Sequence, residues 1–168
     1  MPGELTIDLE DLGLKSGEAL ELTRDFVFSD FTVAGQKFNA SDAEVPLAVH
    51  LSRTTNGWAI HLNFLVELRS ECIRCLGQTP VEIAIDHFEI DQPGAEELES
   101  PYVSEGLFDL GHLATDSVIL DVPLSVLCNQ ECKGICPQCG VDLNNAEPDH
   151  RHESEPDPRW SKLDNLFE

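Results

Sequence analysis

The chain has 168 residues, of which 41% are hydrophobic, so it can bury a core without needing disulfide bonds to fold. Its 32 acidic and 10 basic residues give a net charge of -22, which should repel free nucleic acid, because binding it requires lysine and arginine against phosphates. Between Arg74 and Lys133 there are twelve Asp and Glu and no basic residue, so a basic protein is the natural partner, although acidity also serves solubility alone.

The N-terminal sequence MPGELTIDLEDL has neither the basic start nor the apolar stretch of a signal peptide. No window approaches the ~20 apolar residues of a membrane span. We therefore expect a cytoplasmic protein in a reducing compartment, where the six cysteines would not form structural disulfides.

The first ninety residues alternate apolar and polar side chains with the period of two that is typical of half-buried strands. Strands are expected within residues 5–10, 20–28, 45–52, 58–69 and 81–90, and the alternation is clearest in 58–69. Asn56-Gly57 favours a tight hairpin with positive φ angles, and a change of phase in the last run predicts a bulge near His87. Successive antiparallel strands predict a β-meander or a small barrel.

Helical spacing replaces this alternation after an acidic loop at residues 91–106. Asp109 suits the N-cap of a helix and Pro123 suits its end, so we expect one helix between them. The tail DPRWSKLDNLF predicts a short helix that begins near Asp157.

These elements, with a zinc-knuckle segment that rests on the cysteine spacing described next, predict an α+β fold: an antiparallel meander or small barrel in the N-terminal half, one helix, the knuckle and a short C-terminal helix. We expect a β-rich core domain, with the acidic loop and the helix, over residues 1–122. The cysteine-rich knuckle and the C-terminal helix, packed on that core, would occupy residues 123–168.

Six cysteines and two histidines form the most informative pattern in the chain. A Cys-x-x-Cys pair follows the longest expected strand, and four more cysteines lie within twelve positions of LCNQECKGICPQCGVDLN. Cys-x-x-Cys pairs on tight turns are the pattern of a tetrahedral zinc site, and Gly140 allows the positive φ angle that closes such a turn. The candidate metal ligands are Cys72, Cys75, Cys128, Cys132, Cys136, Cys139, His150 and His152.

These donors can be divided in two ways, so we expect one zinc ion or two. One division places a single zinc between Cys72, Cys75, Cys136 and Cys139, and leaves the others spare or on a second ion. The other joins Cys72 and Cys75 to Cys128 and Cys132, and gives a second zinc to Cys136, Cys139, His150 and His152. Spacing alone does not choose between them.

Two other readings of the cysteines compete with metal binding. Buried unligated thiols are common, but these cysteines lie beside Gly, Pro, Asn and Lys and not on an apolar face. A thiol oxidoreductase using Cys136 and Cys139 would place the pair at a helix N-terminus after a parallel strand, and no such pattern precedes it. Since no Ser-His-Asp order or glycine-rich phosphate loop is present either, we expect a protein that is not an enzyme.

The order of motifs over roughly residues 68–167 resembles the YceD family, whose members are described as large ribosomal RNA subunit accumulation proteins. The resemblance rests on LRSECIRCL, LDVPL, LCNQECKGICPQCGVDLN and DPRWSKLDNLF. It implies a non-enzymatic factor in cytoplasmic ribosome biogenesis, encoded beside a large-subunit ribosomal protein. Many relatives of this subtype carry Cys-x-Cys where this chain has His150-Arg151-His152, and family members differ in how many cysteines they keep.

Together, resemblance and charge predict a partner that is a basic ribosomal protein or a ribosome assembly factor, alone or within a large-subunit precursor. Direct binding to naked nucleic acid or to a membrane is not expected. The alternatives are a zinc-ribbon-like interaction adaptor without a ribosomal role, and the thiol oxidoreductase.

Overall fold

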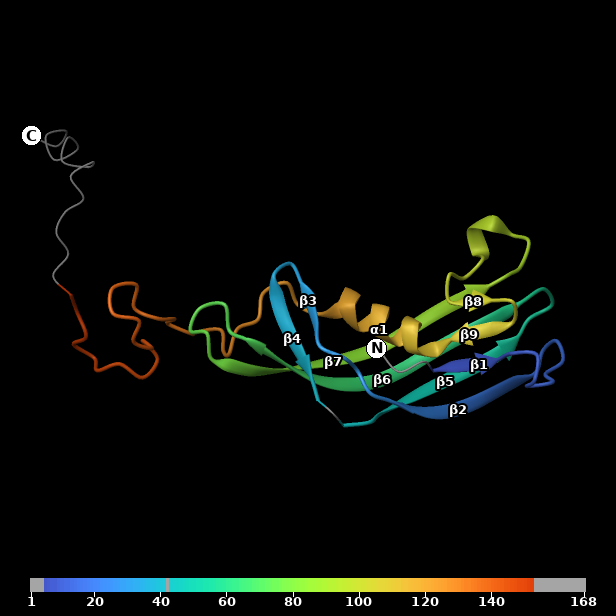
Figure 1. The fold of residues 1–168 in the computed structure, drawn as a ribbon, viewed down its shortest axis with the longest axis horizontal. Helices are drawn as coiled ribbons and strands as arrows, with labels where there is room; N and C mark the ends of the chain where they lie inside the picture. Colours follow the sequence, from blue (N-terminus) through green and yellow to red (C-terminus); the bar gives the residue numbers. More distant parts are fainter. Residues whose placement is uncertain (1–4, 42, 153–168) are drawn as a thin grey trace, which may run out of the picture.

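The computed structural model describes residues 5–41 and 43–152 (Figure 1). The predicted C-terminal helix lies outside the described residues. The elements are, in chain order, β1 (Thr6–Asp8), β2 (Ala19–Phe26), β3 (Phe31–Val33), β4 (Gln36–Ala40), β5 (Val45–Arg53), β6 (Trp58–Glu71), β7 (Gln78–Asp91), the 3-10 helix η1 (Glu96–Leu98), β8 (Val103–Ser104), β9 (Leu107–Asp109) and α1 (Leu110–Asp121). The α+β class is confirmed, with an antiparallel sheet in the N-terminal half and one α-helix among the described residues.

Strand β6 is the centre of a six-stranded antiparallel sheet. It pairs along its whole length with β7, from Trp58 opposite Asp91 to Glu71 opposite Gln78. On its other edge it pairs with β5 near its start and with β4 near its end, and β2 and β3 extend these two branches. The six-stranded arrangement therefore brings the β6–β7 turn to one end of the sheet (Figure 1).

The predicted bulge near His87 is wrong. The register between β6 and β7 runs without interruption through Leu62 opposite His87. Because β7 keeps its phase, Phe88 and Ile90 stay on the face of the sheet away from the core and are 71% and 53% exposed.

The hairpin between β5 and β6 is confirmed, but the predicted positive φ angles at Asn56 and Gly57 are wrong. Gly57 is required for a different reason, since a Cβ atom there would overlap the backbone carbonyl of Asp91. The glycine therefore allows the end of β7 to approach the hairpin closely.

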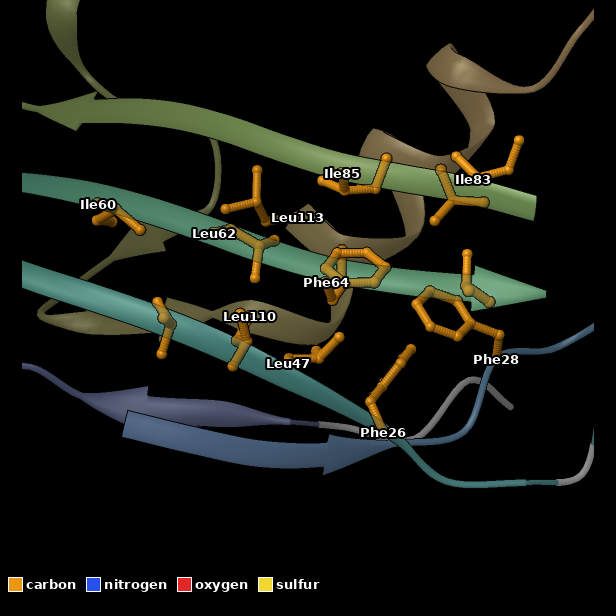
Figure 2. Close-up of a cluster of buried hydrophobic side chains, with 14 of the residues drawn as sticks. Phe26, Phe28, Leu47, Ile60, Leu62, Phe64, Ile83, Ile85, Leu110 and Leu113 are labelled. Atoms are coloured by element: carbon orange, nitrogen blue, oxygen red, sulfur yellow. The ribbon is translucent and has the colours of Figure 1, made fainter. Parts of the chain in front are cut away.

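The core lies between one face of this sheet and a cover made of α1 and the three-stranded sheet β1-β9-β8. Figure 2 shows inward side chains of β5, β6 and β7, among them Leu47, Leu62 and Ile85, gathered with Leu110 and Leu113 of α1. The predicted N-cap is confirmed, because the Asp109 carboxylate accepts a hydrogen bond from the His112 amide at 2.9 Å. Among the described residues, no helix has the length and apolarity needed to cross a membrane.

Candidate metal centres

The first cysteine pair lies on the turn between β6 and β7, as its position after the longest strand predicted. The amide of Cys72 donates to the Gly77 carbonyl and the amide of Leu76 donates to the Cys72 carbonyl, both at 2.9 Å. Leu76 adopts a φ of 60° to close the turn. Cys72 is buried and Cys75 is partly exposed, so this hydrogen-bonded turn offers two thiols from the end of a long hairpin.

The segment that follows α1 is bonded to this turn through backbone groups. Val126, buried in the main core, accepts a hydrogen bond from the Ile73 amide at 2.9 Å. Farther along, the Ile135 amide donates to the Arg74 carbonyl at 3.2 Å. Gly134, with a φ of 78°, permits this approach, since a Cβ atom there would lie 3.1 Å from the same carbonyl oxygen. The segment after α1 thus passes beside the β6–β7 turn (Figure 1).

Four sulfur atoms converge where these two segments meet. The Sγ atoms of Cys72 and Cys132 are 3.8 Å apart, those of Cys75 and Cys128 are 3.6 Å apart, and all four lie within 4.8 Å of one another. Zinc–sulfur distances of about 2.3 Å place the corners of a tetrahedron about 3.8 Å apart. The shortest separations therefore fit a tetrahedral four-sulfur metal site, and they are far longer than the ~2.05 Å of a disulfide.

A second cluster forms within residues 136–152. The amide of Cys136 donates to the Val141 carbonyl and that of Gly140 donates to the Cys136 carbonyl, both at 2.8 Å. Gly140 has the predicted positive φ, 73°. The four donor atoms of this cluster, which again lie within 4.8 Å of one another, come from Cys136, Cys139, His150 and His152.

The separations in the second cluster also suit one ion. The Cys139 sulfur lies 3.6 Å from Nε2 of His150 and 3.3 Å from Nε2 of His152, and the two nitrogens are 3.1 Å apart. With zinc–sulfur and zinc–nitrogen bonds of about 2.3 and 2.05 Å, a tetrahedron gives about 3.6 Å between sulfur and nitrogen and about 3.4 Å between nitrogens. The separations among Cys139, His150 and His152 are therefore within about 0.3 Å of those around one tetrahedral ion, and Cys136 lies close enough to be the fourth ligand.

The thiols of the first cluster have opposite pKa shifts. Burial acts to raise the pKa of Cys72, but hydrogen bonds from backbone amides, led by that of Cys75, lower it to about 6. The Asn144 side chain lowers the pKa of Cys132, whereas a side-chain hydrogen bond with Cys132 is the largest cause that raises the pKa of Cys128 to about 12. Since four thiolates this close repel one another, a divalent cation is the group that would let all four ionise.

In the second cluster the pKa of Cys136 is lowered to about 6, first by a hydrogen bond from the His150 side chain and then by the backbone amides of Cys139 and Gln138. A thiol that ionises this easily suits a metal ligand, because zinc binds the thiolate. It also suits a reactive cysteine, so the pKa alone does not separate the two chemistries.

The structure groups the eight predicted donors as in the second division, because Cys136 and Cys139 lie with the histidines and not with Cys72 and Cys75. The remaining histidines, His50, His61, His87 and His112, belong to neither cluster. Sequence reasoning assigned no role to Asn144, whose amide nitrogen lies 3.4 Å from the Cys132 sulfur and whose Oδ1 accepts from the Lys133 amide at 2.8 Å. The position of Asn144 shortly after the last Cys-x-x-Cys-Gly turn was the feature of the sequence from which this contact could have been predicted.

Comparison with known proteins gives one family. The model of the family described as "Large ribosomal RNA subunit accumulation protein YceD" matches residues 60–167, a range that begins in β6 and includes all eight donors. An uncharacterized protein of Mycobacterium tuberculosis strain H37Rv is 34% identical, over 95% of this chain and 79% of that protein. An uncharacterized protein of Mycobacterium leprae is 31% identical over 58% of this chain and 48% of its own length. No solved structure matches the chain.

Proposed function

Because the chain belongs to the YceD family, we propose that it is a ribosome biogenesis factor that supports accumulation of the large-subunit ribosomal RNA. The family match over residues 60–167 is the observation that carries this proposal. We propose that the protein acts in the cytoplasm, without catalysis, by binding a basic ribosomal protein or assembly factor, alone or within a large-subunit precursor.

Charge supports a protein partner over direct contact with RNA. A net charge of -22 repels phosphates, and the long interval between Arg74 and Lys133 offers no lysine or arginine to neutralise them. The same charge attracts the basic segments by which ribosomal proteins bind RNA, and it accelerates their encounter. A factor of this kind would keep such a protein soluble until it is assembled.

We further propose that zinc occupies both donor clusters, with Cys72, Cys75, Cys128 and Cys132 on one ion and Cys136, Cys139, His150 and His152 on the other. The donor chemistry and the separations near those of a tetrahedron support this proposal. The first ion would fasten the segment beyond residue 122 to the β6–β7 turn and add its binding energy to folding. This role supports the proposed division into a core of residues 1–122 and an appendage of residues 123–168.

Deletion of the gene in its native host tests the ribosomal role. The expected result is a fall in large-subunit relative to small-subunit ribosomal RNA and a loss of large subunits on sucrose gradients, both restored by the intact gene. An unchanged ratio in the deletion strain would contradict the proposal. If the protein nevertheless bound zinc and a protein partner, it would be an interaction adaptor without a ribosomal role.

A thiol oxidoreductase using Cys136 and Cys139 is the second candidate, because the pKa of Cys136 is lowered to about 6. The two histidines near Cys139 favour metal binding instead, since both nitrogens lie within 3.6 Å of its sulfur. Elemental analysis of protein purified without added metal, combined with a disulfide reduction assay, separates the two. Two zinc ions per chain and no reductase activity are expected.

A further inference from the structure

One face of the six-stranded sheet points away from the core. Outward side chains of β6 pair with outward side chains of β7, and His61 lies opposite Phe88. Leu65, Phe88 and Ile90, here called the apolar centre, are 54%, 71% and 53% exposed, so the described residues leave more than half of each one's surface in solvent. Because α1 and the three-stranded sheet cover the opposite face, we call this surface of β2, β5, β6 and β7 the outer face.

The most exposed member of the apolar centre is held in place. The ring of Phe88 stacks on His61 with centroids 4.0 Å apart and an interplanar angle of 5°. His61 is fixed in turn by a 2.6 Å contact between its Nε2 atom and the Asp86 carboxylate. One face of the Phe88 ring is therefore covered and the other is free, a preorganised arrangement that suits an anchor for a partner side chain.

The charge of the outer face is strongly one-sided. Its outward strand positions carry six carboxylates, from Glu21, Asp25, Glu67, Glu71, Glu82 and Asp86. The lysines and arginines at the outward positions of β2, β5, β6 and β7 amount to Arg69 alone, eight residues along β6 from His61. At about 3.3 Å per residue this cation is about 26 Å from the stacked pair. The neighbouring β4 adds Lys37, whose ammonium group already pairs with Asp30 at 3.4 Å.

We propose that the outer face is the docking surface for a Lys/Arg-rich, extended segment of the protein partner. The inference rests on the proposed function, because that function takes the partner to be basic. Lysine and arginine of the segment pair with the surrounding carboxylates, while their apolar stems cover Leu65 and Ile90. An arginine of the segment stacks on the free face of Phe88, which adds a cation–π contact.

The same charge disfavours other occupants. A second copy of this chain would bring two sets of six carboxylates together, and RNA would bring phosphates. The chain's own residues 153–168 contain five acidic and two basic residues, so that segment is also repelled. A basic segment can contact both the apolar centre, through its apolar stems, and the six surrounding carboxylates, through its charges.

The test uses the full chain and a fluorescent synthetic peptide with the repeated sequence Arg-Leu-Lys, with binding followed by fluorescence anisotropy at low salt. Phe88→Thr keeps a strand-forming residue and is expected to weaken binding about tenfold. The double variant Glu82→Gln, Asp86→Asn is expected to weaken it and to flatten its salt dependence. Leu120→Ser, which replaces an exposed leucine of α1 outside the outer face, is the matched control and should bind like the unaltered chain.

Equal binding by the Phe88→Thr variant and the unaltered chain would overturn the proposal, because general acidity would then suffice. Self-association abolished by Phe88→Thr would assign the face to a second copy instead. Tighter peptide binding after removal of residues 153–168, with Phe88 newly accessible, would assign it to that segment. If peptide binding depends on Phe88 but deletion of the gene leaves ribosomal RNA unchanged, the proposed ribosomal function would be rejected and the proposed docking surface would be retained.

Discussion

Loss of one metal ligand should have very different consequences at the two clusters. Cys128→Ser and Cys139→Ser form a matched pair, because both cysteines are exposed and neither replacement opens a cavity in the core. Each variant should bind one zinc ion instead of two. Only Cys128→Ser is expected to lower the midpoint of global thermal unfolding substantially.

The difference follows from the length of chain that each cluster closes. Cys75 and Cys128, which meet at the first cluster, are 53 residues apart, whereas Cys139 and His150 are 11 apart. The loop-closure term (3/2)RT ln(53/11) is about 1.4 kcal/mol, so an unfolded chain gathers the donors of the second cluster about tenfold more readily. Metal at the first cluster therefore depends more strictly on the folded sheet and on α1, which the 53-residue loop contains.

The expected size of the effect comes from mass action. Free zinc at about a thousand times its dissociation constant stabilises the folded chain by about 4 kcal/mol if the unfolded chain does not bind it. For a chain of this length, that corresponds to a fall of about 8–16 °C in Tm when the first cluster is lost. Thermal unfolding followed by circular dichroism, with zinc content by mass spectrometry, checks both quantities. Equal Tm values for the two variants, each with one zinc bound, would refute the reasoning.

Three further outcomes are expected. Asn144→Ala removes the side-chain amide that contacts the Cys132 sulfur, so it should lower the zinc affinity of the first cluster about 10–100-fold. The zinc affinity of the second cluster should stay unchanged, and competition with a chelating dye measures both. Gly57→Ala should lower Tm, because the new Cβ atom overlaps the Asp91 carbonyl; an unchanged Tm in a thermal melt would show that β7 can move away. The pKa of Cys136 in the folded protein is lowered from 9.0 to about 6, so the stability linked to its thiolate is present above pH 9 and is lost as the pH falls through about 6. Zinc release, followed with a chelating dye, should therefore rise below pH 6. Zinc release that does not change between about pH 8 and about pH 5 would contradict this prediction.

Alternation and capping predicted the parts of the fold in which local and tertiary preferences agree. Strands β2, β5, β6 and β7 lie where period-two runs indicated, and α1 begins at the predicted cap, Asp109. The short strands β3, β4, β8 and β9 were missed because they are two to five residues long and give too few alternations to recognise. The turn between β3 and β4 places Ala34 at a φ of 49°, where propensity expects glycine or asparagine.

The candidate metal centres were predicted as a set of donors but not as two groups. Spacing shows which cysteines share a turn, but it does not show which turns meet in space. That meeting is set by long-range contacts, such as the bonds from Ile73 to Val126 and from Ile135 to Arg74. Both bonds join the β6–β7 turn to a segment more than fifty residues away, and no periodicity in the sequence encodes them.

The error at His87 and the proposed docking surface have the same physical origin. Alternation in a strand is interpreted by assigning apolar residues to the core-facing positions. Phe88 and Ile90 occupy outward positions of β7, so in the sequence they look like a change of register. The continuous pairing with β6 instead leaves both side chains in solvent, at a cost that a partner can recover by covering them. Cys72 lies eleven residues along the chain from His61, about 36 Å for extended chain, so the first cluster and the stacked pair of His61 and Phe88 lie toward opposite ends of β6. Metal loss at the first cluster can then alter stability at that end of the sheet while the stack of His61 and Phe88, the proposed anchor, stays in place.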